Sequence, residues 1–163
     1  MFSGTVRSNL CFGSDDDGTA MVLDDATAWH ALRLCHLDQF VAQLPHGLDT
    51  AVGTGGSGWS LGQQQLLCLG RALLRRSTLL CIDEATAAVD PHTDSLIQRT
   101  LRSAEECRCA TVLTIAHRLS TVMSYDRIAV MEGGRLVECN SPAALMADPR
   151  SALSQLVRDN NND

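Results

Sequence analysis

The sequence has 163 residues, of which 45% are hydrophobic and 20% charged, and its formal net charge is −6. This length and composition predict about one domain with a hydrophobic core, not a disordered chain. The acidic balance argues against nucleic acid as a partner, because phosphate backbones bind to basic surfaces. No apolar run approaches the roughly 18 residues of a membrane span, so we expect any membrane anchor on another segment or chain.

The basic residues and the cysteines indicate the compartment and the redox state of the chain. All 13 lysine-or-arginine positions are arginine, so the chain has no lysine. The seven cysteines form no CxxC pair, and the chain opens without a signal-peptide pattern. We therefore expect a cytosolic chain with reduced cysteines, most of them small residues of the core.

Apolar periodicity predicts helices that alternate with short strands. The expected helices span residues 24–37, 60–76 and 91–104 and a stretch from 142 onward, with a glycine-rich loop at 45–58. The expected strands span 79–82, 111–116 and 127–131 and include 136–137, the last two being joined by a Gly-Gly turn at 133–134. The first is a short apolar run, which is typical of a strand buried on both faces of a parallel sheet, and the second is interpreted as another buried strand. This alternation indicates an α/β fold with a mostly parallel sheet.

Polar side chains follow two of these strands where they end. Asp83 and Glu84 follow the first strand, and His117 follows the second. In an open parallel sheet, ligands bind beyond the carboxyl ends of the strands. One carboxylate of the acidic pair can hold Mg²⁺ while the next orients or deprotonates a water molecule. The alternatives are a helix cap beside a solvated acid for the pair, and an ordinary core or surface residue for His117.

A second candidate site opens the helix predicted at 60–76. Ser60, Gly62 and Gln63 follow the glycine-rich loop directly. A helix N-terminus with a hydroxyl, a glycine backbone and free N–H groups is a ready anion site. The alternative is an ordinary serine N-cap without a ligand. Together with the two polar strand ends, this helix start favours the functional interpretation.

Four segments, in this order, resemble the motifs of ATP-binding cassette (ABC) proteins. Residues 59–63 (WSLGQ) resemble the signature motif, 79–84 (LLCIDE) the Walker B strand with its catalytic glutamate, 87–90 (AAVD) the D-loop and 116–120 (AHRLS) the switch-histidine segment. Residues 2–10 (FSGTVRSNL) and 84–90 (EATAAVD) are most similar to the second nucleotide-binding domain of the multidrug-resistance-associated (C) subfamily.

The resemblance continues through 136–138 and 141–142, so it covers nearly the whole chain. It implies an incomplete P-loop NTPase domain with a mostly parallel core sheet, flanking helices and a helical signature subdomain. We expect a partial nucleotide-binding domain, followed by a frayed tail. The expected ranges are 1–159 for the domain, with a mostly helical part at 1–76 and the second half of the catalytic core at 77–159, and 160–163 for the tail.

The resemblance also implies roles at the strand ends. Asp83 would organise Mg²⁺, Glu84 would act as the base on water, and His117 would contact the γ-phosphate of ATP.

Further roles follow at the helix starts. Ser60, Gly62 and Gln63 would reach the γ-phosphate of an ATP molecule bound to a second nucleotide-binding domain. Asp90 would lie at the interface between the two domains.

The chain departs from the family pattern in two ways. The first signature residue is usually leucine, whereas here it is Trp59. No Gly-x-x-x-x-Gly-Lys-Ser/Thr P-loop occurs, and none can occur without lysine. We expect the P-loop, the Q-loop glutamine and the adenine-stacking aromatic residue to precede Met1.

Three functions are compatible with these motifs. The first, which we favour, is ATP binding and hydrolysis that energises export of organic substrates in a full-length transporter. In that case the chain lies at the cytosolic face of a membrane, beside transmembrane domains and a second nucleotide-binding domain. The second is a truncated, non-catalytic module that pairs with another cassette through its signature face. The third is the ATPase head of a chromosome-maintenance or DNA-repair protein, against which the acidic charge and the lack of coiled-coil heptads before Ser60 argue.

Overall fold

The computed structural model describes residues 1–11, 23–83, 90–115 and 119–160. Contacts divide the chain into two compact units, Met1–Ile115 and Ala116–Asp163. Each unit has its own cluster of buried apolar residues.

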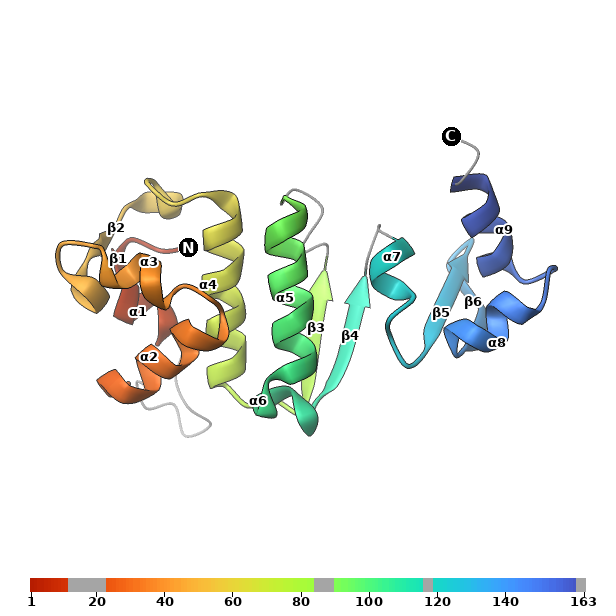
Figure 1. Ribbon diagram of the computed structural model, residues 1–163, viewed down its shortest axis with the longest axis horizontal. Coiled ribbons are helices and arrows are strands. Elements are labelled where there is room, and N and C mark those ends of the chain that lie inside the picture. The colour runs from red at the N-terminus through yellow and green to blue at the C-terminus, as the bar shows by residue number, and fades with distance from the viewer. Residues whose placement is uncertain (12–22, 84–89, 116–118, 161–163) are drawn as a thin grey trace. The chain divides into compact units, whose positions relative to one another are not determined.

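Small elements at the start of the first unit lie on one side of a long helix, α4 (Leu61–Leu74) (Figure 1). They are β1 (Gly4–Thr5), α1 (Val6–Leu10), α2 (Asp25–Leu34), α3 (Asp38–Ala42), a 3-10 turn at Gly47–Asp49, β2 (Ala51–Val52) and a second 3-10 turn at Thr54–Gly56. β1 and β2 form an antiparallel pair, and α1 and α2 pack directly against α4.

The apolar stripe of α4 explains why the other elements gather around it. Leu66, Leu69 and Leu73 recur on one face of the helix and are all buried. Burying one such side chain contributes about 1.5–3 kcal/mol. A Cβ atom on Gly70 would lie 3.3 Å from Cys35 Sγ, so the missing side chain lets the end of α2 approach α4 closely.

A parallel pair of strands follows α4. β3 (Leu79–Asp83) pairs with β4 (Thr111–Ile115) in register, so that the last residues, Asp83 and Ile115, lie side by side. α5 (Pro91–Ser103) and the short α6 (Glu105–Arg108) connect the strands. This connection is the parallel β-α-β unit that the alternation of strands and helices predicts.

The described elements of the first unit cover only one face of the β3–β4 pair. Leu80 and Ile82 pack against the core of the first unit, whereas their neighbours point to the other face. There Leu79, Leu113 and Ile115 keep 54%, 57% and 57% of their surface exposed. The expectation that both strands are buried on both faces is therefore wrong for the described chain. No described element of the first unit packs over this second face, because α4 and α5 both lie on the first.

The described residues of the second unit form a hairpin and three helices. α7 (Leu119–Val122) precedes β5 (Ile128–Glu132) and β6 (Arg135–Asn140), which α8 (Pro142–Ala147) and α9 (Ala152–Asn160) follow. Gly133 and Gly134 both take positive φ angles, 52° and 74°, as the expected two-residue hairpin turn requires. The carboxylate of Glu138 accepts hydrogen bonds from the backbone of Ala152 at 2.7 Å and of Leu153 at 3.4 Å, which caps α9.

The element boundaries differ from the expected ones in two places. The helix expected at 24–37 ends at Leu34, because His36 adopts a left-handed φ of 57° and the chain restarts as α3. The strand expected around 136–137 extends over Arg135–Asn140.

The expected division of the chain rests on motifs, whereas the observed one rests on contacts. The motif boundary lies after residue 76, and the contact boundary lies after Ile115. Asn160, expected in a frayed tail, is the last residue of α9, and residues 161–163 lie outside the described ranges. Among the helices that are described, none is both long and apolar enough to cross a bilayer.

The uncovered face of β3 and β4 predicts self-association of the purified chain. An exposed apolar strand face and an unpaired strand edge both favour contact with other molecules. We expect the chain to bind hydrophobic dyes and to elute as oligomers in size-exclusion chromatography. The double variant Leu113→Lys/Ile115→Lys should reduce both effects while changing the free energy of unfolding by about 0.5 kcal/mol or less, the usual range for exposed sites.

A matched control is Leu156→Lys, since Leu156 is a leucine of the second unit that is 51% exposed on α9. If the control reduced dye binding as much as the double variant, the β3–β4 face would not be the cause. A monodisperse monomer with a sharp melt would also contradict the prediction.

Candidate functional site

The carboxyl end of the parallel strand pair carries the first predicted site residue. Asp83 ends β3 with an exposed side chain and pairs in register with Ile115, the last residue of β4. Glu84 and His117 follow these strand ends in the sequence but lie outside the described residues. Of the three residues expected at the strand ends, the structure therefore describes Asp83 alone.

The start of α4 carries the second group of predicted residues. Ser60 is the N-cap, and its Oγ accepts a hydrogen bond from the backbone amide of Gln63 at 3.2 Å. The side chain of Gln63 reaches back and accepts one from the backbone amide of Ser60 at 2.9 Å. This reciprocal capping box fixes both side chains at the helix N-terminus.

The capping box still leaves donors for an anion. The bonds found among the described residues use Ser60 Oγ and Gln63 Oε1 only as acceptors, so the hydroxyl proton and the side-chain amide protons have no assigned acceptor there. The backbone N–H groups of Leu61 and Gly62 have no acceptor within the helix. The first turn of α4 contains no acidic residue, so nothing in that turn opposes a bound anion.

Trp59, the departure from the family pattern, packs away from this helix start. Its ring meets Phe40 of α3 edge to face, with centroids 5.0 Å apart. Its backbone carbonyl accepts a hydrogen bond from Gln64 Nε2 at 3.1 Å, and Gln64 also bonds the carbonyl of Gly56 at 3.4 Å. The tryptophan therefore ties the preceding loop to α3 and leaves the donors of the capping box accessible.

Asp90 caps α5. One carboxylate oxygen accepts from the backbone amides of His92 and Thr93, each at 3.0 Å, and the other accepts from the Thr93 hydroxyl at 2.7 Å. These bonds stabilise the charged form, the Thr93 hydroxyl most strongly, and so lower the pKa of Asp90 below the ordinary value of 3.8. Pro91 at the first helical position completes the helix start.

Thr93 brings the two helix starts together, and the sequence reasoning missed it. A Cβ atom on Gly62 would lie 2.9 Å from Thr93 Oγ1 and 3.1 Å from its Cγ2. The residue that bonds Asp90 therefore also touches the signature glycine. The available signal was the spacing Asp90-x-x-Thr93, which is typical of a side-chain cap at a helix start.

A pocket of about 230 Å³ connects Asp83 with α4. It is lined by the last residues of β3 and by one face of α4, and the lining includes Asp83, Gln65, Cys68 and Cys81. The side-chain oxygen of Gln65 is buried there and has no hydrogen-bond partner among the described residues.

The donor set at Asp83 fits Mg²⁺ in one respect. A carboxylate oxygen is the kind of ligand that Mg²⁺ prefers, and Mg²⁺ in phosphate-processing sites uses one or two carboxylates with water and substrate oxygens. Within the described ranges, no three histidine, cysteine or acidic side chains gather as a metal site. Asp83 thus offers one carboxylate, a kind of group that can ligate a nucleotide-bound Mg²⁺.

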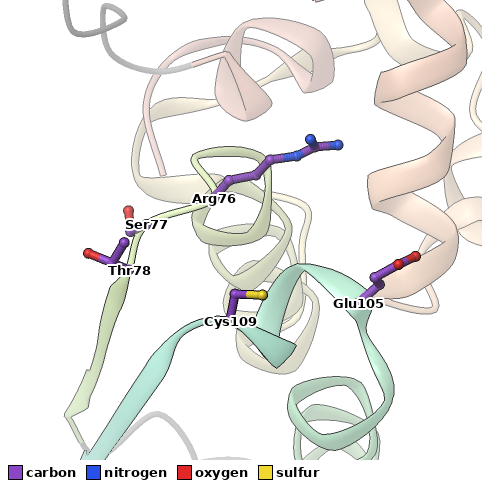
Figure 2. Close-up of a pocket in the computed structure, with 5 residues that line it drawn as sticks. All are labelled: Arg76, Ser77, Thr78, Glu105 and Cys109. Carbon is purple, nitrogen blue, oxygen red and sulfur yellow. The ribbon is translucent and has the colours of Figure 1, made fainter.

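A larger pocket, about 440 Å³, lies at the opposite ends of the strands. Figure 2 shows its lining side chains: Arg76, Ser77, Thr78, Glu105 and Cys109. The guanidinium of Arg76 and the hydroxyls of Ser77 and Thr78 point in different directions. Because these polar groups do not converge and the pocket adjoins the amino ends of β3 and β4, it lacks the features of a nucleotide site.

The sequence of the chain is similar to those of known proteins. The family profile described as "ABC transporter" matches residues 4–87. "Multidrug resistance protein mrp-7" of Caenorhabditis elegans is 48% identical over 98% of this chain, and human "ATP-binding cassette sub-family C member 3" is 49% identical over 98%. The chain spans about a tenth of the length of each of these two relatives.

A solved structure shares the fold. "Structure of a bacterial Atm1-family ABC exporter with ATP bound" superposes with a TM-score of 0.83 and 32% sequence identity. The match covers 98% of this chain and 26% of that one.

The lowered pKa of Asp90 predicts how acid affects the start of α5. Because the folded-state pKa lies below the unfolded one, the carboxylate stabilises the fold at pH values above 3.8 and loses this contribution as pH falls through its folded-state pKa. Asp90→Asn keeps the acceptor oxygen but removes the charge. In urea unfolding, we expect the variant to be less stable than the parent at neutral pH. The difference should vanish well below pH 3.8. A difference that stayed constant over this range would show that the charge of Asp90 does not matter.

Proposed function

Because the chain belongs to the ABC transporter family, we propose that it supplies the signature and Walker B half of a nucleotide-binding domain that binds and hydrolyses ATP. The observation that carries the proposal is the start of α4, where a capping box presents hydroxyl, amide and backbone donors in one place. Asp83 at the carboxyl end of β3 supports it, since ligands of parallel sheets bind at that edge.

The donors at the start of α4 bind phosphate in this proposal. Ser60, Gly62 and Gln63 contact the γ-phosphate of an ATP molecule held by a second nucleotide-binding domain. The free N–H groups of the first turn and the positive end of the helix dipole favour an anion there. Asp90 lies at the interface of the two domains, where its exposed carboxylate is already fixed by Thr93.

The strand ends perform the chemistry. Asp83 holds Mg²⁺, which neutralises charge on the phosphates when bound. Glu84 accepts a proton from the attacking water, and His117 contacts the γ-phosphate. These three roles come from the family resemblance. Of the three residues, Glu84 and His117 lie outside the described ranges.

The rest of the proposal concerns the full-length protein. Its transmembrane domains and a second nucleotide-binding domain are the partners, the cassette lies at the cytosolic face of a membrane, and ATP hydrolysis energises export of organic substrates. The high identity to C-subfamily members over nearly the whole chain supports this assignment. A non-catalytic module that pairs through the signature face is the alternative, because the α4 donors do not require a lysine.

The chain by itself should turn over almost no ATP. Phosphoryl transfer depends mainly on positioning and electrostatic stabilisation of the phosphates, and a chain without lysine lacks the P-loop residue that cradles them. Steady-state phosphate release by the purified chain should match that of its Glu84→Gln variant. Strong hydrolysis that the substitution abolished would refute this prediction.

A chimera tests the catalytic roles directly. The chain would replace the matching segment of "ATP-binding cassette sub-family C member 3", with which it shares 49% identity. Glu84→Gln should lower hydrolysis by about 10²–10⁴-fold, the usual contribution of a general base, while ATP binding persists. Asp83→Asn should instead weaken nucleotide binding in the presence of Mg²⁺. An equal binding defect in both variants would disprove this division of roles, and binding without any hydrolysis in the parent chimera would favour the non-catalytic module.

A further inference from the structure

The glycine at position 62 is explained by a neighbour and not by its own backbone. Gly62 lies in the first turn of α4 and is absent from the residues with positive φ in the described chain. Glycine in a helix is less favourable than alanine, so its presence needs a local reason. The reason is space: an added Cβ would lie 2.9 Å, 3.1 Å and 3.4 Å from the Oγ1, Cγ2 and Cβ atoms of Thr93.

Thr93 is itself held in place. It is only 8% exposed, and its branched side chain has few rotamers. Its Oγ1 donates a hydrogen bond of 2.7 Å to Asp90, and the same atom is the one that a Cβ added to Gly62 would meet first. A displacement of the Asp90 carboxylate therefore moves the atom that the start of α4 rests against.

An internal comparison separates this arrangement from an ordinary cap. Asp24 and Thr27 repeat the Asp-x-x-Thr cap at the start of α2, with bonds of 2.9 Å to the backbone amide and 3.0 Å to the hydroxyl of Thr27. No glycine of the described chain has Thr27 among the nearest atoms to its added Cβ. The threonine of the α5 cap thus contacts a glycine of another helix, and capping of α5 does not require this contact.

We propose that Thr93 is a positioning residue that couples Asp90 to the phosphate-binding donors at the start of α4. When a partner domain binds Asp90 and shifts its carboxylate, the hydroxyl of Thr93 carries the change to Gly62 and hence to the capping box of Ser60 and Gln63. This inference rests on the proposed function for the roles of Asp90 and the signature residues. The coupling between the two helix starts can be tested without it.

The direct test is hydrogen exchange of the backbone amide of Gln63 in the 163-residue chain. Thr93→Val removes the hydroxyl and should speed this exchange about fivefold or more, in the range of ordinary coupling energies. Thr93→Ser keeps Oγ1 and should stay within about twofold of the parent. The control, Thr27→Val, removes the equivalent bond at α2 and should leave Gln63 unchanged. Equal effects of the two valine variants on Gln63, or none from Thr93→Val, would overturn the coupling.

A second pair of variants tests the contact even if Thr93→Val folds poorly. Gly62→Ala should speed exchange at Gln63, because the new Cβ meets Oγ1 and Cγ2 of Thr93. Adding Thr93→Ala removes both atoms and leaves only the Cβ contact at 3.4 Å, so exchange should recover towards the parent. Gly62→Ala and Thr93→Ala are also measured singly. If exchange at Gln63 in the double variant were accelerated by the product of the two single factors, the residues would act independently and the proposal would fail.

The chimera provides the functional readout. Thr93→Val should lower kcat about fivefold with a smaller change in KM for ATP, whereas Thr27→Val should change neither. A residue that only supports the fold would lower the amount of active protein equally for both variants and leave the kcat of the active fraction unchanged. If the exchange results hold but the parent chimera hydrolyses ATP no better than its Glu84→Gln variant, the proposed function fails while the coupling stands.

Discussion

The close packing of α4 against its neighbours is the constraint on which the first unit depends. Its leucine stripe buries the inner faces of α1 and α2, and two glycines set how near the neighbours come. Gly70 admits the end of α2, and Gly62 admits the start of α5. Interiors are packed densely enough that one added methyl group must displace something. The same helix that organises the core therefore also fixes the spacing between the two helix starts that carry Ser60 and Asp90.

Strand pairing then orients the chemistry towards one edge. The parallel register of β3 and β4 places Asp83 beside Ile115, so both strands end at the same edge. The helix starts at Ser60 and Asp90 carry positive partial charge, and Asp83 contributes negative charge beside the pocket next to α4. In the proposed function these two kinds of charge serve different contacts. The helix start at Ser60 faces the phosphates of an ATP molecule held by the second domain, and Asp83 faces the Mg²⁺ at this chain's own strand ends.

Much of this could be predicted from the sequence, for identifiable physical reasons. The helix at 61–74 and its serine cap follow from leucine periodicity and the capping-box spacing, and the glycine turn at 133–134 follows from the φ angles it requires. The exposure of Leu113 and Ile115 could not be predicted. The apolar residues of a strand show that its burial is favourable, but they do not show whether a covering element is present. Thr93 was missed for a related reason. Its cap to Asp90 is local, but its contact with Gly62 joins residues 31 positions apart, and no periodic pattern encodes such a pair.

The hydrogen bonds of Asp90 show how a partner domain can use this residue without dismantling the cap. A carboxylate offers about four lone-pair positions. Three are occupied by the two amides and the Thr93 hydroxyl, and the side chain is nevertheless exposed. A donor from another domain can therefore bind the remaining position while the start of α5 stays capped. Because the carboxylate is already fixed, such a contact costs little side-chain entropy. Its lowered pKa keeps it charged throughout the physiological pH range, so the strength of that contact does not depend on protonation of Asp90.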